Sequence, residues 1–143
     1  MIPAEHYKQI LEVMPLLCVD VIIKNSRGEY LLVRRANEPL QGQWWVIGGR
    51  VLKNETLEQA VIRKVKQEVG LTIRELTPVG YYEDRFEKNS IPLDSPLHTV
   101  SVVFSTSIDG QQPIKLDGQS LEWQFLKELP KAFHVKPFHE CSV

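Results

Sequence analysis

The stretch from Gly48 to Leu71, GGRVLKNETLEQAVIRKVKQEVGL, constrains the fold more than any other part of the chain. Apolar residues recur at helical spacing from Leu57 to Val65 and predict an amphipathic helix with one buried stripe. We expect Asn54 to be the N-cap of this helix, with Glu55 in its first turn. Gly70 is predicted to end the helix in the left-handed conformation.

Glu68 is the unusual residue of this helix. It follows Val61 by seven residues and Val65 by three, so it lies at the end of the buried stripe. A carboxylate on the core-facing side of a helix is costly unless it has a partner. The sequence therefore predicts a partner for Glu68; the alternative is a charge that stays solvated at the helix end.

Length and charge limit the classes of function. The chain has 143 residues, 43% of them apolar, which suits one domain covering residues 1–143. Seventeen basic and eighteen acidic residues give a net charge of −1, which argues against nucleic acid as a main partner.

Cys18 and Cys141 form neither a metal spacing nor a disulfide framework. The apolar run Val13–Ile23 is too short to cross a membrane, so we expect a cytoplasmic protein without a membrane partner.

The remaining elements are mostly extended. A short helix is predicted at Pro3–Val13, a loop or lid at Asp84–Leu97, and a short helix or tail at Ala132–Val143. Strands are predicted at Leu16–Ile23, Tyr30–Arg34, Trp44–Ile47, Leu71–Glu83, His98–Ile108 and Leu121–Leu126. Strands outnumber helices, and the connections are too short for repeated βαβ crossovers. This pattern predicts an α+β fold with a mixed sheet.

The central stretch resembles the Nudix box, the signature helix of the Nudix hydrolases. Five residues of the box fall in register: Gly49, Glu55, Arg63, Glu68 and Gly70. Lys64 and Gln67 stand where the box has two further glutamates. The resemblance implies a Nudix fold, in which the box helix packs against a mixed sheet between helices, and it implies a hydrolase.

Among Nudix proteins, a box thinned in this way is characteristic of the GDP-mannose mannosyl hydrolases. Further blocks of the chain are similar to that group: Leu31–Arg35, Gln41–Val46, Gly48–Val51 and Asp117–Ser120. The resemblance implies a nucleotide sugar, GDP-mannose, as substrate. It also implies attack of water at the anomeric carbon, which releases GDP and mannose with inversion. A homodimer is implied in the same way.

The resemblance also implies roles for individual residues. A metal ion, Mg²⁺ with Mn²⁺ as a possible substitute, would be held by the Gly48 carbonyl, Glu68 and Gln119. Arg35 and Arg50 match arginines that contact the diphosphate and help the nucleotide leave, a role that suits the guanidinium fork. Each of them could instead be a surface arginine at a strand end.

Two further residues match positions near the substrate of that group. Asp20 matches an aspartate, and it is equally compatible with a carboxyl group paired inside the core. Thr99 stands where a tyrosine contacts the phosphates. In each of two aromatic pairs, Trp44–Trp45 and Tyr81–Tyr82, at least one ring is expected in the core, and neither pair is expected in the site.

The chain departs from that group at Ser120, where the group has a histidine as general base. Losing a general base typically lowers a rate by about 10²–10⁴-fold. The replacement leaves three outcomes open: slow turnover, a different base or a changed reaction. His98 is expected to be structural. The alternatives to the mannosyl hydrolase are therefore a Nudix diphosphohydrolase that cleaves a P–O bond and a non-catalytic module that binds a nucleotide sugar.

Overall fold

The structure is a computed structural model that describes residues 2–109, 112–118 and 120–138. In chain order its elements are α1 (Ala4–Val13), β1 (Leu16–Lys24), β2 (Tyr30–Arg35), β3 (Trp44–Trp45), β4 (Ile47–Arg50), α2 (Leu57–Val69), β5 (Thr77–Phe86), β6 (Leu97–Ser107), β7 (Ser120–Leu126) and β8 (Lys136–Pro137). Within the described residues, neither helix is long and apolar enough to cross a membrane.

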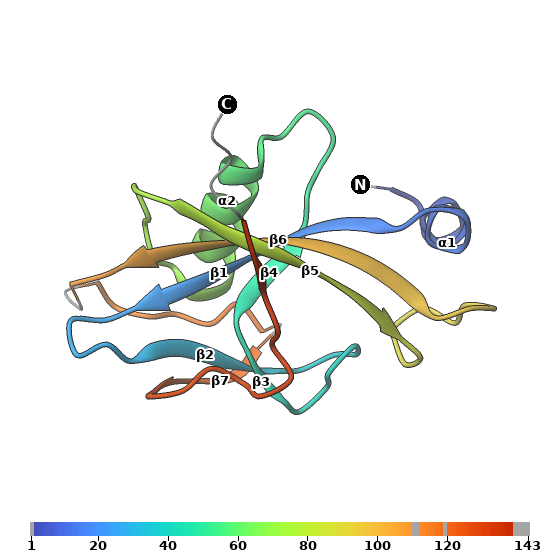
Figure 1. The fold of residues 1–143 in the computed structure, drawn as a ribbon. Helices are drawn as coiled ribbons and strands as arrows, with labels where there is room; N and C mark the ends of the chain where they lie inside the picture. The colour runs from blue at the N-terminus through green and yellow to red at the C-terminus, as the bar shows by residue number, and fades with distance from the viewer. Residues whose placement is uncertain (1, 110–111, 119, 139–143) are drawn as a thin grey trace.

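The strands form one mixed sheet around β1 (Figure 1). β1 runs parallel to β6 along its whole length, from the pair Leu16–Thr99 to the pair Lys24–Ser107. On its other side, β1 pairs antiparallel with β4 over Cys18–Val21 and with the start of β2. β2 carries β3 and β7, whereas β6 carries β5, which in turn pairs with β8. The predicted α+β class with a mixed sheet is confirmed.

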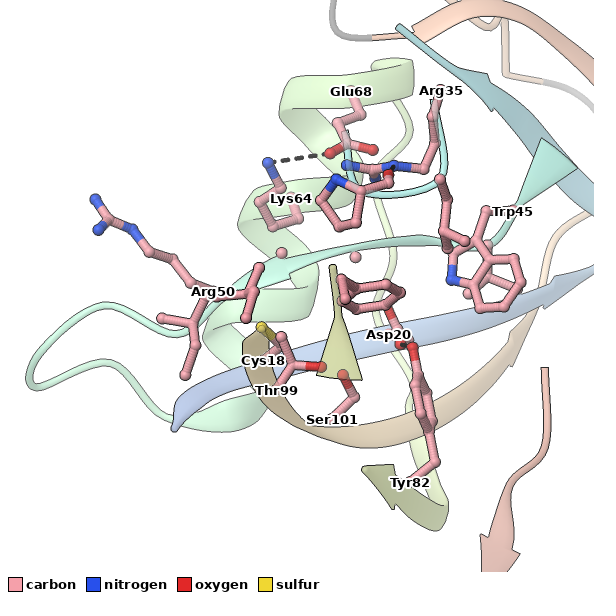
Figure 2. Close-up of a pocket in the computed structure, with 18 of the residues that line it drawn as sticks. Cys18, Asp20, Arg35, Trp45, Arg50, Lys64, Glu68, Tyr82, Thr99 and Ser101 are labelled. Carbon is pink, nitrogen blue, oxygen red and sulfur yellow. Dashed lines mark hydrogen bonds and ion pairs between the residues drawn. The ribbon is translucent and has the colours of Figure 1, made fainter. Parts of the chain in front are cut away.

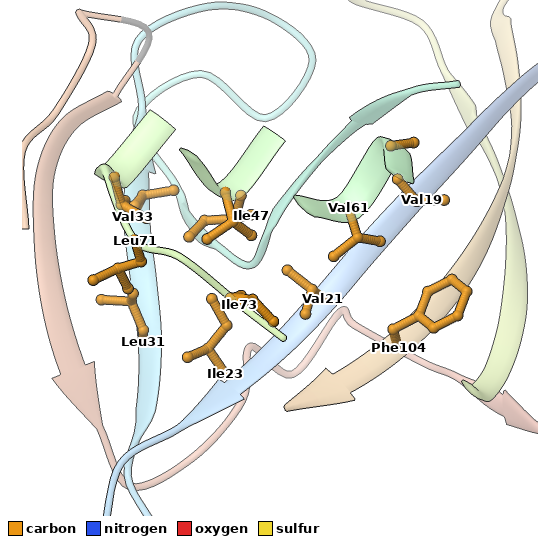
Figure 3. Packing of buried hydrophobic residues seen from close by; sticks show 13 residues of the cluster. Val19, Val21, Ile23, Leu31, Val33, Ile47, Val61, Leu71, Ile73 and Phe104 are labelled. Carbon is orange, nitrogen blue, oxygen red and sulfur yellow. The ribbon is translucent and has the colours of Figure 1, made fainter. Parts of the chain in front are cut away.

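Hydrophobic packing covers both faces of this sheet. Alternation along β1 turns Val19, Val21 and Ile23 toward α2, where Val61 and Val65 meet them in a buried cluster (Figure 3). The opposite face is covered by a second cluster, which consists of Ile22, Leu32, Trp45, Val46, Val103 and Phe133. The predicted buried stripe of the helix is therefore present and packs against β1 and β4.

The start of α2 differs from the prediction. Asn54 is not the N-cap: its backbone is left-handed, with φ of 70°, and the cap is Thr56. Thr56 Oγ1 accepts a hydrogen bond from the Gln59 amide at 3.1 Å, and Gln59 Oε1 accepts one from the Thr56 amide at 2.9 Å. This reciprocal capping box satisfies two backbone donors, so it outcompetes an asparagine cap. Glu55 consequently precedes the helix, while Gly70 ends it with φ of 74° as predicted.

Three other boundaries also differ from the prediction. Trp44–Ile47 is not one strand, because Val46 separates β3 from β4 and the glycine pair lies inside β4. The strand predicted at Leu71–Glu83 begins only at Thr77 and continues to Phe86, into the predicted loop. Within the described part of the tail, residues 132–138 contain β8 instead of a helix. Its hydrogen bonds to β5 explain the extended conformation.

Removing the capping box should weaken the fold measurably. Thr56→Ala deletes the side-chain acceptor at the start of α2 and is expected to lower the free energy of unfolding by about 1 kcal/mol. Thr56→Ser keeps the hydroxyl and should remain within a few tenths of the wild-type value. Urea unfolding followed by circular dichroism measures both; equal midpoints for the alanine and serine variants would contradict the assignment of this cap.

Candidate active site

A cavity of about 300 Å³ lies where β1, β4, β6 and α2 converge with the loop that follows β2 (Figure 2). Six of the seven residues that the sequence predicts for the site line this cavity: Asp20, Arg35, Gly48, Arg50, Glu68 and Thr99. The seventh, Gln119, lies outside the described residues. The fold therefore brings together residues that are spread over 80 positions of sequence between Asp20 and Thr99.

Glu68 reaches the cavity from the last turn of α2 and is only 6% exposed. Its partner is Lys64, one turn earlier, whose Nζ lies 3.0 Å from Glu68 Oε1. Burial raises the pKa of the Glu68 carboxyl group, and the charge of Lys64 opposes this effect. The charge of Asp117 raises this pKa further. The partner predicted for Glu68 is thus a side chain of the same helix.

The two glycines of β4 make this arrangement sterically possible. A Cβ on Gly48 would lie 1.9 Å from Asp20 Oδ1 and 2.5 Å from the Val19 carbonyl oxygen. A Cβ on Gly49 would lie 2.5 Å from Cε of Lys64. Any larger residue at either position would displace a side chain that lines the cavity. The glycine pair therefore serves close packing, and neither glycine has a positive φ.

Asp20 lies in the cavity wall on β1, opposite Gly48 in the strand pairing, and is 6% exposed. The Tyr82 hydroxyl donates a short hydrogen bond to Asp20 Oδ2, and Ser101 also hydrogen-bonds to this carboxyl group. Burial raises the pKa of Asp20 to about 7, against the lowering effects of the Tyr82 hydrogen bond and of Arg35. Asp20 is thus a carboxyl group that changes charge near neutral pH.

The two arginines enter the cavity differently. Arg35 Nε donates to the Pro39 carbonyl at 2.8 Å, which ties the guanidinium to the loop after β2. Figure 2 shows this guanidinium turned toward Glu68, whereas Arg50 points away from the Lys64–Glu68 pair. The Arg50 guanidinium lies 4.6 Å from the centre of the Tyr7 ring, a cation–π contact with α1.

The box residues Glu55 and Arg63 hold the backbone beside the site. Arg63 binds the Glu55 carboxylate through two nitrogens, at 2.7 and 3.0 Å, and donates to the Arg50 carbonyl at 3.0 Å. This bidentate pair links the turn before α2 to the helix itself. Its role is therefore to position the end of β4.

Sequence reasoning missed several residues that line the cavity. The sequence predicts neither Trp45 nor Tyr82 in the site, yet both line the cavity, and it gives Lys64 only as the loss of a glutamate. The alternation of β5 and β6 could have placed Tyr82 beside Asp20 only if the order β1-β6-β5 were known. Cys18 also lines the cavity; burial raises its pKa to about 12, so it is an uncharged thiol.

Neither Ser120, which stands where the mannosyl hydrolases have a histidine, nor His98 lines this cavity. Ser120 is buried at the start of β7, where it pairs with Arg35 across the strands, and it does not line the cavity. His98 is half-buried on β6, also outside the lining, and its Nε2 has no hydrogen-bond partner among the described residues. Asp20 and Glu68 are therefore the two carboxyl groups that line the described cavity.

Comparison with known proteins identifies the family. The chain matches the NUDIX domain family over residues 14–140. The chain belongs to the NUDIX family. It is 31% identical over 118 residues to the low-salt glycan biosynthesis protein Agl8 of Haloferax volcanii, covering 82% of this chain and 74% of that protein. It is 34% identical over 125 residues to an ADP-ribose pyrophosphatase of Methanocaldococcus jannaschii, with coverage of 87% and 70%.

Solved structures agree on the fold of this NUDIX domain. A MutT NUDIX hydrolase from Burkholderia pseudomallei superposes with a TM-score of 0.70 at 21% identity, covering 85% of this chain and 91% of that one. The predicted Nudix fold is therefore confirmed, with α2 as the box helix packed against the mixed sheet. Family membership also supports the predicted hydrolase class.

NUDIX hydrolases generally use divalent metal ions such as Mg²⁺. In the present arrangement Lys64 opposes the binding of such an ion beside Glu68. No three His, Cys, Asp or Glu side chains of residues 2–109, 112–118 and 120–138 converge on one point. One oxygen of Glu68 is paired with the ammonium group of Lys64, which is itself a cation. The ligand set Gly48, Glu68 and Gln119 stays a prediction.

The raised pKa of Asp20 predicts a pH dependence of stability. Between its unfolded pKa near 3.8 and its folded pKa of about 7, the folded protein keeps a proton that the unfolded chain has released. Raising the pH through this window therefore lowers the free energy of unfolding. Asp20→Asn removes the pH-dependent contribution of this carboxyl group. The free energy of unfolding of the variant, relative to that of the wild type, should therefore increase by about 3 kcal/mol between pH 5 and pH 8.

Urea unfolding at both pH values measures this difference. Asp94→Asn is the matched control, because Asp94 is exposed and its replacement should change stability equally at the two pH values. A difference between Asp20→Asn and wild type that stays constant from pH 5 to pH 8 would contradict the raised pKa.

Proposed function

We propose that the protein hydrolyses a nucleoside diphosphate sugar, with GDP-mannose as the substrate and water attacking the anomeric carbon. The observation that carries the proposal is the composition of the cavity. Its lining combines Arg35, Arg50 and Lys64, which suit a diphosphate, with the carboxyl groups of Asp20 and Glu68. The names of the two relatives, a glycan biosynthesis protein and an ADP-ribose pyrophosphatase, support substrates that join a sugar to a diphosphate.

The arginines would stabilise the departing nucleotide. Cleavage of the sugar carbon–oxygen bond leaves negative charge on the diphosphate, and a preorganised guanidinium lowers the energy of that charge. Arg35 is held by Pro39 and Arg50 by its contact with Tyr7, so both are oriented before the substrate binds. A general acid on the leaving group is then unnecessary.

Asp20 is the residue that we assign to receive the proton of the attacking water. A general base works best when its pKa lies near the working pH, and the pKa of Asp20 is about 7. Glu68 is the other carboxyl group of the lining, but Lys64 occupies one of its oxygens. This assignment accounts for the absence of a histidine at Ser120, because the base comes from β1 instead of β7.

Attack at phosphorus is the second candidate. Two observations favour it: the relative from M. jannaschii is named a pyrophosphatase, and Ser120 replaces the histidine expected for attack at carbon. The same cavity would then bind the same substrate, but water would attack a phosphorus atom and the products would be GMP and mannose 1-phosphate. A non-catalytic module that binds the nucleotide sugar is the third reading.

Three further features remain predictions. Mg²⁺ held by Gly48, Glu68 and Gln119 would share the Glu68 carboxylate with Lys64 or displace it. For a homodimer, the apolar surface near the N-terminus offers a contact face, since Val13 is 78% and Met14 59% exposed. Sedimentation analysis tests that association, and cell fractionation tests the cytoplasmic location.

Product analysis in ¹⁸O-labelled water separates the candidate reactions. The purified protein is incubated with GDP-mannose, with and without Mg²⁺, and the products are separated and weighed by mass spectrometry. Attack at carbon is expected, which gives GDP without label and mannose with one ¹⁸O. Label in GMP or in mannose 1-phosphate would instead mean attack at phosphorus. Intact GDP-mannose that stays bound to the protein would make it a binding module.

Replacing one cavity arginine should weaken substrate binding. Arg35→Met removes a charged donor to the diphosphate, and we expect KM for GDP-mannose to rise about tenfold or more. Arg34→Met is the matched control: Arg34 is the preceding residue of β2, does not line the cavity, and pairs with Glu122 at 2.9 Å. Kinetic assays of both variants measure the difference; equal KM values would remove Arg35 from the site.

A further inference from the structure

The Lys64 ammonium group lies 3.0 Å from Glu68, the carboxylate that the resemblance assigns to a metal ion. We propose that the Lys64 ammonium group is the resident cation of this site, so that a diphosphate binds in the cavity without a divalent ion. The proposal rests on the proposed function only in taking a diphosphate as the ligand. On this proposal, the lysine that stands in place of a box glutamate supplies the positive charge of the site.

The geometry of the pair places Lys64 in the site and not on the protein surface. Its Nζ lies 3.0 Å from Glu68 Oε1, and the two side chains are only 13% and 7% exposed. The stem of Lys64 crosses Gly49, where no Cβ obstructs it. Figure 2 shows the ammonium group joined to Glu68 by a dashed line, and Lys64 is one of the residues that line the cavity. An ammonium group has three donors, so two remain for a ligand.

A divalent ion and this ammonium group would compete for the same oxygen. Mg²⁺ binds carboxylate oxygens at about 2.0–2.1 Å and needs near-octahedral space around itself. An ion at that distance from Glu68 Oε1 would lie next to Lys64 Nζ, and the two positive charges would repel each other at low dielectric constant. Metal binding at this oxygen therefore requires the displacement of Lys64.

Helix stabilisation alone does not account for the pair. In isolated helices the favourable order is Glu followed by Lys four residues later, whereas here Lys64 precedes Glu68. Glu68 also lies in the last turn of α2, where the helix dipole disfavours a negative charge. A buried carboxylate at this end of a helix needs a nearby cation, and Lys64 supplies it.

The charge balance of the cavity agrees with a site that needs no metal. Its lining has three cationic side chains, Arg35, Arg50 and Lys64, and two carboxyl groups, Asp20 and Glu68. The sum is positive even when both carboxyl groups are ionised. A diphosphate can therefore enter a positive cavity without bringing a metal ion.

The first test measures diphosphate binding in the presence of EDTA. Isothermal titration with inorganic diphosphate, which carries no base or sugar, should show saturable binding to the wild-type protein. Lys64→Met should weaken this binding about tenfold or more, whereas Lys64→Arg should retain most of it. Lys66→Met is the matched control, because Lys66 is an exposed lysine of the same helix and should leave binding unchanged. Wild-type binding that appears only after Mg²⁺ is added would overturn the proposal.

The second test measures metal binding directly. Electron paramagnetic resonance of Mn²⁺ alone should show weak binding to the wild-type protein and an affinity at least about tenfold higher for Lys64→Met, in which Glu68 is free. Equal Mn²⁺ affinities would overturn the proposal. Because Lys64→Met leaves a buried carboxylate unpaired, Lys64→Met/Glu68→Met provides a second variant with an apolar pair. It should fold and should also bind diphosphate more weakly than wild type in EDTA.

These outcomes separate the inference from the proposed function. If diphosphate binds without metal and depends on Lys64 but GDP-mannose is not hydrolysed, the proposed function fails and the resident cation stands. If GDP-mannose is hydrolysed but both its turnover and diphosphate binding need Mg²⁺, the resident cation is wrong and the proposed function stands.

Discussion

Close packing of two glycines between β1 and α2 is the constraint on which the rest of the site depends. Gly48 lets the Asp20 carboxyl group lie against β4, and Gly49 lets the stem of Lys64 pass over the same strand toward Glu68. Without the close contacts at Gly48 and Gly49, α2 could not bring the Glu68 carboxylate and the Lys64 ammonium group to the edge of a cavity lined by β1. The glycine pair thus couples the packing of the fold to the charges of the site.

Much of this architecture could be predicted from the sequence, because local signals and packing agree. Glu68 was identified from its place on a buried stripe, and the structure shows both the burial and the partner. The N-cap was missed although its signal is present: Thr56 and Gln59 have the spacing of a capping box, a stronger signal than a single asparagine. That error changed the predicted start of the helix but not its predicted buried face.

The contents of the cavity could be predicted only in part, because they depend on strand order. Tyr82 is 62 residues from Asp20, and they meet only because β6 inserts between β1 and β5. Alternation gives the face of a side chain but not its neighbour in the next strand. Lys64 was misread for another reason: compared with a family pattern it is a missing acid, whereas in space it is an added cation.

Replacing a glutamate by lysine changes the local charge by two units, so Lys64 has a larger effect than the loss of one metal ligand. A metal site and an ammonium site stabilise the same anionic ligand, but they differ in what they require of Glu68. A metal uses the carboxylate as a ligand, whereas Lys64 uses it as a counter-ion that holds the ammonium group in place. Glu68 can therefore be essential to the cavity in either case, and its burial alone does not identify the cation. Lys64, four positions earlier in the helix, does identify the cation, because its positive charge decides which cation can approach Glu68.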